Sequence, residues 1–470
     1  GANVTILTGK TTVVYLDGAG SGAAVVDALA LVDPGVTDTL AEVLAAGNAT
    51  GGNDLDISIG DDFTTLTEGT SNFRAGVNAG NSIASGGNHN VAVGDEAGTA
   101  ITTGDSNVAV GYAALDANTT ASFNTAVGKD ALTANTTGSA HTAVGYAALG
   151  ANTTDVNNIA IGSKTLDANT TGNYNSAVGT LALTANTTGS HNAALGYVAL
   201  AANTTGEDNT AVGDNALTAN TTGASNTAMG VEALDSNTTA SNNTAVGKSA
   251  LGANTTGVSN AVVGANAMDA NTTGGDNSVL GFGAMGANTI GGRNVSVGEN
   301  SLYTNVAGFR STAVGFEALF TQNPGSSATD VYNTAVGYSA GRAVTTGTQN
   351  TFVGGLAGDG SQTGTGNTAL GYQSLSGVVT GGYNTALGWG AGQANTSGLN
   401  NTSVGTQALF LNTVGNYNVA MGEGALYTNV DGSQSVAIGR LALYTQEPAS
   451  AVNMLNTAVG YAAGQLVTTG

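Results

Sequence analysis

The chain has 470 residues, including 73 glycines, three prolines and no cysteine, and only 9 % of its residues are charged, against roughly 25 % in an ordinary soluble domain. Aromatic residues make up 5 % of the chain, too few to fill several compact cores, so the composition argues against an enzyme and favours a thin, repeated core. The nine basic residues against 31 acidic ones give a net charge of −22, which argues against nucleic acid as a partner.

The first 75 residues are predicted to form a small α+β adaptor or collar. Strand-like runs occur at 4–7 and 11–16, and the segment at 51–69 reads as a further strand with polar turns. The segment at 38–48 (DTLAEVLAAGN) has an Asp N-cap, apolar residues at helical spacing and a terminating Gly-Asn, which predicts a helix. The acidic turns at 53–56 and 60–62 match no calcium-loop consensus, so no metal site is predicted from them.

A single repeat dominates residues 76–470, which we predict to be one shaft of about 22 coils. A glycine directly after a short apolar run recurs at 22 positions, and 19 of the 21 intervals between these positions have the same length. These anchor glycines are at 94, 111, 128, 145, 162, 179, 196, 213, 230, 247, 264, 281, 298, 315, 337, 354, 371, 388, 405, 422, 439 and 460. Such regularity is typical of a repeat architecture.

The 17-residue consensus N-T-A-V-G-x-x-A-L-x-A-N-T-T-G-x-x predicts one coil of a parallel β-solenoid made of two short strands and two turns. Period-two alternation places Thr125 and Val127 on one face of the first strand, with Val127 and Leu132 expected to point inward. Ala126 lies on the other face, where its small size permits a close approach. Asn and Thr recurring at each level are expected to form ladders along the shaft.

The Ala-rich face indicates that the chain assembles with copies of itself. Each coil has about two sizeable apolar side chains for a core of its own. The Ala side chains are too small to make a core by themselves, and a close interface with a copy of the same chain would need such small side chains. We therefore expect an oligomeric fibre.

Two irregular intervals, of 22 and 21 residues, predict loops that protrude from the shaft near 321–332 and 445–455. They fall at equivalent points of a longer repeat, since the glycines at 298 and 422, and at 315 and 439, are each 124 residues apart. Because loops on a rigid scaffold commonly carry recognition, they are the first candidates for partner contact. The candidate contact residues are Asn323, Pro324, Gly325, Glu447 and Pro448.

Two family resemblances rest on these motifs. The strands NVAVG at 90–94 and 107–111 and SVAIG at 435–439 resemble the head domains of YadA-type trimeric autotransporter adhesins, which implies a left-handed parallel β-roll that forms a homotrimer. The pattern NTAVGYxAL…ANTTG, with the opening TTVVYLDGAGSGAAVVDAL and TLAEVLAAGNATGGNDL, resembles tail-fibre proteins of tailed phages. The coil of this chain is longer than the adhesin head repeat, and neither a signal peptide nor an apolar membrane anchor is recognised, which favours the phage resemblance.

Aromatic residues directly after anchor glycines would line one corner of the shaft, either packing against the next coil or stacking on sugar rings. They are Tyr112, Tyr146, Tyr197, Tyr338, Tyr372, Trp389 and Tyr461. The histidines at 89, 141 and 191 lie four or five residues before an anchor glycine, where a trimer could bring three imidazoles together on its axis, although exposed or ladder-stacked side chains are the simpler interpretation.

The sequence thus predicts an all-β fibre that is not an enzyme and needs no cofactor. The resemblance implies the tail-fibre shaft of a phage virion, outside the cell, whose partners are two further copies of the chain, other virion tail proteins and a host cell-surface glycan or protein. No insertion into a membrane is expected. A trimeric autotransporter adhesin head fragment is the alternative. A polysaccharide-degrading tailspike would need paired carboxylates, whereas Asp130, Asp214, Glu299 and Glu317 occur singly.

Overall fold

The computed structural model describes residues 14–16, 25–27, 69–360 and 362–469, and the chain divides into two compact units, 1–63 and 64–470. In the first unit, β1 (Val14–Leu16) pairs antiparallel with β2 (Val25–Asp27), and β1 falls within the strand predicted at 11–16. The strand predicted at 4–7, the helix at 38–48 and the acidic turns at 53–56 and 60–62 lie outside the described residues, as does nearly all of the segment at 51–69.

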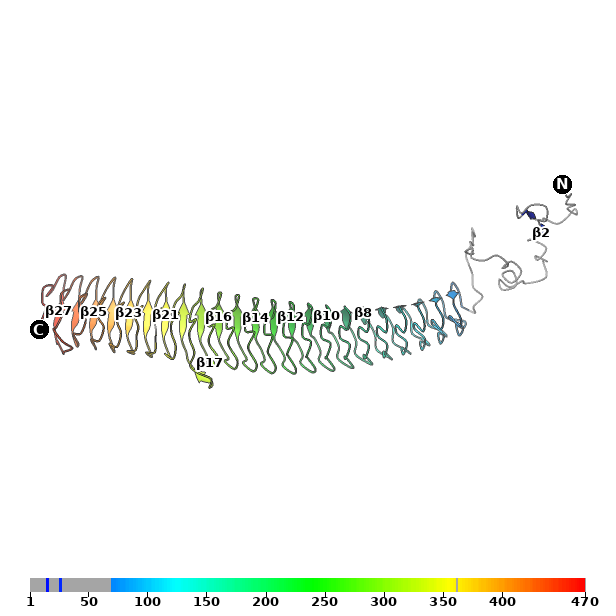
Figure 1. Cartoon of the computed structure of the whole chain (residues 1–470), viewed down its shortest axis with the longest axis horizontal. Coiled ribbons are helices and arrows are strands. Elements are labelled where there is room, and N and C mark those ends of the chain that lie inside the picture. The colour runs from blue at the N-terminus through cyan, green and yellow to red at the C-terminus, as the bar shows by residue number, and fades with distance from the viewer. Residues whose placement is uncertain (1–13, 17–24, 28–68, 361, 470) are drawn as a thin grey trace. The chain divides into compact units, whose positions relative to one another are not determined.

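The second unit is a parallel β-solenoid, as the repeat predicts, and no helix occurs in the ranges that the structure describes. One three-residue strand per coil pairs in parallel with its equivalents in the coils before and after (Figure 1). The strands are β3 (Phe73–Ala75), β4 (Val91–Val93), β5 (Val108–Val110), β6 (Thr125–Val127), β7 (Thr142–Val144), β8 (Ile159–Ile161), β9 (Ser176–Val178), β10 (Ala193–Leu195), β11 (Thr210–Val212), β12 (Thr227–Met229), β13 (Thr244–Val246), β14 (Ala261–Val263), β15 (Ser278–Leu280), β16 (Val295–Val297), β18 (Thr312–Val314), β20 (Thr334–Val336), β21 (Thr351–Val353), β22 (Thr368–Leu370), β23 (Thr385–Leu387), β24 (Thr402–Val404), β25 (Val419–Met421), β26 (Val436–Ile438) and β27 (Thr457–Val459).

The strand faces are the reverse of the prediction, because Ala points into the solenoid and Val points out. Ala126 in β6 is fully buried together with Leu132, whereas Thr125 and Val127 are only half-buried. The interior of so short a coil is narrow, so in most coils one Leu or Met fills it and only a small side chain fits opposite. The Ala-rich row is therefore core and cannot serve as the interface between copies that the sequence suggested.

Volume compensation inside the coils supports this assignment. Phe352 replaces the usual Ala in β21 and is fully buried. Gly341 and Gly358 stand where neighbouring coils have Leu, and a Cβ built on either glycine would come within 2.9 Å or less of the Phe352 ring. The large ring thus occupies the volume that the missing leucines leave, which shows that the two rows share one core.

The prediction of two strands per coil is wrong, because the segment after the anchor glycine is not extended. Asp130 and Leu132 have φ angles of 58° and 51°, in the left-handed region that interrupts a strand. The backbone still bonds from coil to coil, since Leu132 N donates to Ala148 O at 3.0 Å and Ala134 N donates to Gly150 O at 3.2 Å. This side of the solenoid therefore has inter-coil hydrogen bonds without a second regular strand.

Two rows of buried asparagines form the predicted ladders. In the row four residues before each anchor glycine, Asn124 N donates to Asn107 Oδ1 at 3.0 Å and Asn124 Nδ2 donates to Gly138 O at 3.0 Å. In the row seven residues after, Asn135 Nδ2 donates to Asn118 Oδ1 at 3.1 Å and to Gly138 O at 2.9 Å. Because a buried side-chain amide without hydrogen-bond partners is costly, these ladders keep successive coils in register.

The anchor position requires glycine for two reasons. Across the shaft the anchor glycines have φ angles between 123° and 147°, a region that side chains rarely adopt. The coils also approach closely there, so that a Cβ on Gly196 would lie 2.4 Å from Gly213 O of the next coil. The constant interval between anchor glycines in the sequence thus records a backbone contact between successive coils.

Candidate functional site

The first long coil carries an exposed loop tip at residues 325–328. Among the predicted contact residues, Asn323 and Gly325 are exposed and Pro324 is half-buried. Asn323 N donates to Thr345 O at 3.0 Å, and Asn323 Oδ1 accepts a hydrogen bond from Gly325 N at 3.0 Å. Below the tip, β17 (Gly308–Phe309) pairs in parallel with β19 (Thr329–Asp330). The loop is therefore presented on a short second sheet beside the main ladder.

In the second loop the structure places the predicted contact residues against the solenoid. Glu447 is half-buried and its Oε2 accepts a hydrogen bond from Val430 N at 2.6 Å, while Pro448 is buried. Burial raises the pKa of the Glu447 carboxyl, and the hydrogen bond from the Val430 amide opposes that rise. The exposed part of this loop consists of residues 449–453 instead.

At the base of each loop, the same two residue types replace asparagines of the two ladders. Gln322 and Gln446 replace ladder asparagines, and Ser311 and Ser435 replace the facing ones. Gln322 Nε2 donates to Asn305 Oδ1 at 3.1 Å and to Ser311 Oγ at 3.0 Å. The longer side chain next to the shorter one keeps the ladder continuous across the wider coil.

The predicted aromatic corner is exposed along the shaft, but the structure does not gather its residues into one site. Their exposed fractions range from 44 % for Trp389 to 71 % for Tyr461. Lys129 Nζ lies 5.7 and 5.6 Å from the ring centroids of Tyr112 and Tyr146, between the two rings. Tyr338 stacks on Phe316 with a centroid distance of 5.4 Å. Tyr197, Tyr372 and Trp389 lie in the same row, one coil position after the anchor glycine.

A second aromatic row, five residues after the anchor glycines, was not singled out from the sequence. Tyr303 stacks on Phe320 with centroids 5.4 Å apart, and Tyr427 stacks on both Phe410 and Tyr444 at 5.1 and 5.0 Å. The signal was present, because these aromatics recur at the repeat interval in consecutive coils. A ring at the same coil position in successive levels is expected to stack on its neighbour.

The three histidines lie in two different environments. His89 and His191 are exposed, and His191 stacks on Tyr174 at a centroid distance of 5.3 Å. His141 replaces a ladder asparagine and is 1 % exposed inside its own coil. A ring of three imidazoles between chains is therefore not open to His141.

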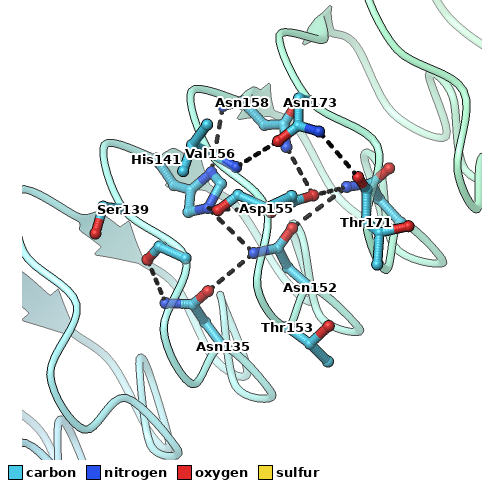
Figure 2. A network of polar contacts seen from close by, with 12 residues as sticks. Asn135, Ser139, His141, Asn152, Thr153, Asp155, Val156, Asn158, Thr171 and Asn173 are labelled. Atoms are coloured by element: carbon cyan, nitrogen blue, oxygen red, sulfur yellow. Dashed lines mark hydrogen bonds and ion pairs between the residues drawn. The ribbon is translucent and has the colours of Figure 1, made fainter.

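The buried His141 is matched by a second exception, Asp155, which stands where most coils have glycine (Figure 2). Asn158 N donates to His141 Nδ1 at 3.2 Å, and His141 Nε2 lies 3.2 Å from Asp155 Oδ1 and 3.1 Å from both Asp155 O and Asn152 Nδ2. Asp155 Oδ2 accepts hydrogen bonds from the side-chain amides of Asn158 and Asn169. Because every polar partner belongs to the interior of the solenoid, we assign this cluster to the core and not to a binding site.

The outward strand face carries a continuous apolar row, which we call the apolar strand row. Its members are the Val, Ile, Leu or Met side chains directly before the anchor glycines. Those exposed by 37 % or more are Ile161, Val178, Leu195, Met229, Val263, Leu280, Val336, Leu370, Leu387, Met421, Ile438 and Val459. Since large contiguous apolar patches are uncommon on the surface of monomeric proteins, this row is a candidate interaction surface.

Over the described part of the chain, no group of three or more His, Asp or Glu side chains is arranged to hold a metal ion. Within the same ranges, no helix has the length and hydropathy that crossing a membrane requires. Comparison with known proteins finds no match to the chain among family models, curated proteins or solved structures.

Proposed function

We propose that this chain is the shaft of a homotrimeric fibre, a left-handed β-roll of a phage tail appendage that projects a receptor-binding surface from the virion and takes part in host attachment. The fibre has no enzymatic role and no cofactor, and its weak surface contacts are summed over three chains. Its partners are two further copies of the chain, other tail proteins and a host cell-surface glycan or protein.

The apolar strand row carries this proposal. A side chain such as Leu195 or Leu280, half exposed in a single chain, would be buried if the strand faces of several chains met along their length. Each contact is small, but it repeats at every coil, so the stabilisation grows with the length of the shaft. A surface that is apolar along the whole strand ladder fits a partner with the same repeat interval, namely another copy of this chain.

The distribution of charge agrees with this arrangement. Charged residues are few, and the net charge of the chain is −22. No member of the apolar strand row is charged. Like charges on the remaining faces would keep fibres from adhering to one another while the uncharged strand faces associate.

The decisive experiment is the mass of the full chain in solution, measured by light scattering or mass photometry. The proposal expects three times the chain mass of 45.5 kDa. A particle of 45.5 kDa at micromolar concentration would contradict the fibre, although the single-chain solenoid would stand. Binding of the purified trimer to intact bacterial cells, without release of sugars, would support attachment over polysaccharide degradation.

A further inference from the structure

A cleft of about 400 Å³ is lined by residues that follow the anchor glycines of consecutive coils. It lies between coils 264–280 and 298–314. Gly283, two residues after an anchor glycine, lines the cleft, and Gly286, five residues after the same anchor, faces the lining residue Tyr303. The coil from Gly281 combines glycine at both positions, whereas every other coil has a side chain at one of them or both. The missing side chains leave a notch one coil deep in an otherwise regular surface.

The residues of the coils on either side form the walls of this notch. Asn300 leans over Gly283, where a Cβ would lie 2.6 Å from Asn300 Oδ1. Tyr303 leans over Gly286, where a Cβ would lie 2.9 Å from Tyr303 Cε2. Asn266 and Asp269 line the opposite wall, and Phe282 lies beside the floor. The cleft therefore depends on both glycines and would be narrowed by a side chain at either.

Stacking and ion pairing hold the aromatic wall in place from one side. Tyr303 stacks on Phe320 with an interplanar angle of 7°, and the Arg342 guanidinium lies 5.6 Å from the centroid of Phe320. Arg342 is held in turn by an ion pair with Glu317. This stack ends at Tyr303, whose other face is turned toward the coil in which Gly286 has no side chain. Tyr303 is 39 % exposed and Phe282 is 54 % exposed, so both rings present an accessible apolar surface.

The polar wall offers both donors and acceptors. The side-chain amides of Asn266 and Asn300, which line the cleft, have no hydrogen-bond partner among the described residues. Asp269 is partly buried, which raises the pKa of its carboxyl, while the amides of Asp269 and Ala270 lower it. Neutral hydroxyl groups suit such a mixture, because each can donate to a carboxylate and accept from an amide. The lining includes no basic side chain, which disfavours an anionic ligand.

We propose that this cleft binds one uncharged pyranose ring of a surface glycan, with the apolar face of the sugar against Tyr303 and its hydroxyls on Asn266, Asp269 and Asn300. An aromatic platform with a few convergent polar groups, in a volume within the roughly 300–1,000 Å³ of ligand clefts, is what such recognition needs. The inference rests on the proposed attachment function and names its ligand class. The cleft also lies next to the first protruding loop, since Phe320 is three residues before Asn323.

The test measures binding of the full chain to immobilised neutral oligosaccharides of glucose, galactose, mannose and N-acetylglucosamine, with soluble monosaccharides in titration calorimetry. Gly283→Asn fills the notch and is expected to fold, because Asn266 and Asn300 occupy the same coil position with φ angles of 54°. Tyr303→Leu removes the platform. We expect either change to weaken binding of the preferred sugar at least ten-fold.

Matched controls are Gly390→Asn, at the same coil position as Gly283, and Tyr427→Leu, at the same position as Tyr303 in the other aromatic stack. Both should bind the sugar as the unchanged chain does. Equal binding by Gly283→Asn and the unchanged chain, no binding of any neutral sugar at millimolar concentration, or selective binding of phosphocholine would each overturn the cleft proposal. The oligomeric mass is measured in parallel: a trimer without sugar binding leaves the fibre standing, and a monomer that binds sugar leaves the cleft standing.

Discussion

At the scale of single residues, the anchor glycine is the position at which substitution should destabilise the coil most. Replacing Gly196 by Ala adds a Cβ 2.4 Å from Gly213 O in a backbone region with φ of 145°. Backbone strain and overpacking together should lower the stability by roughly 2–5 kcal/mol. Gly355→Ala is the control, because the nearest atom to its Cβ would be Tyr372 Cδ2 at 3.5 Å. Thermal unfolding followed by circular dichroism should show a lower midpoint for the Gly196 variant alone.

The buried His141 and Asp155 are expected to behave as one unit. His141→Asn alone leaves Asp155 Oδ1, which has no hydrogen-bond partner apart from the imidazole, buried without a partner and should cost roughly 1–3 kcal/mol. Adding Asp155→Gly restores the Asn and Gly found at Asn124 and Gly138 in the preceding coil. The double variant should recover most of the lost stability. A double-mutant cycle in guanidinium measures the coupling, and additive effects would contradict it.

In several coils a partly buried aspartate lies five residues after the anchor glycine. Burial is the main cause that raises the pKa of Asp116, Asp167, Asp235, Asp269 and Asp359. A raised pKa in the folded state means that the ionised form is disfavoured there, so stability is lost as pH rises above the ordinary Asp value of about 3.9.

The double change Asp167→Asn and Asp235→Asn should therefore raise the melting temperature at pH 7. The gain should vanish as the pH falls below about 3.9, where both folded and unfolded carboxyls are protonated. The control is Asp208→Asn with Asp276→Asn, whose side chains are 62 % and 57 % exposed. A gain of the same size for both pairs, or one that persists in acid, would show that burial is not the cause.

At the scale of the coil, each long loop depends on a glutamine that spans the widened ladder. Gln322 Nε2 and Oε1 bond to Asn305, Ser311 and Asn333. Shortening it by Gln322→Asn should leave some of these buried groups without partners and cost roughly 1–3 kcal/mol. The control is the exposed Gln434→Asn, at a position where Asn157 and Asn242 occur in other coils. Differential scanning calorimetry would test this, and equal midpoints would contradict it.

The coil also shows how far its structure could be predicted from the sequence. The repeat interval, the parallel pairing, the asparagine ladders and the long coils follow from spacing and residue type alone. Which face of the strand points inward cannot be predicted in this way, because alternation defines two faces without saying which one is inside. The larger apolar side chain of Val127 predicts that it points inward, yet the narrow interior accepts Ala126 opposite Leu132.

At the scale of the whole molecule, the apolar strand row should control assembly. Leu195→Glu, Leu280→Glu and Leu387→Glu together place three charges on this row in each chain, where they would be buried between copies. We expect the triple variant to be monomeric by mass photometry. The matched control puts Glu at Val231, Val258 and Leu399, which are 43 %, 43 % and 40 % exposed on other faces. If the control dissociates equally, or if the strand-row variant stays trimeric, this face is not the interface.

The sequence by itself determined the architecture, because a glycine at a nearly constant interval, ladder asparagines and a leucine in most coils are satisfied together by stacking equivalent coils. Tertiary structure alone decided three further features: the face of the strand that points outward, the pairing of His141 with Asp155, and the cleft over Gly283 and Gly286. Each depends on which side chains become neighbours across coils, and on the width of the interior between them. That width is set by packing in three dimensions and cannot be predicted from the residue spacing within a single coil.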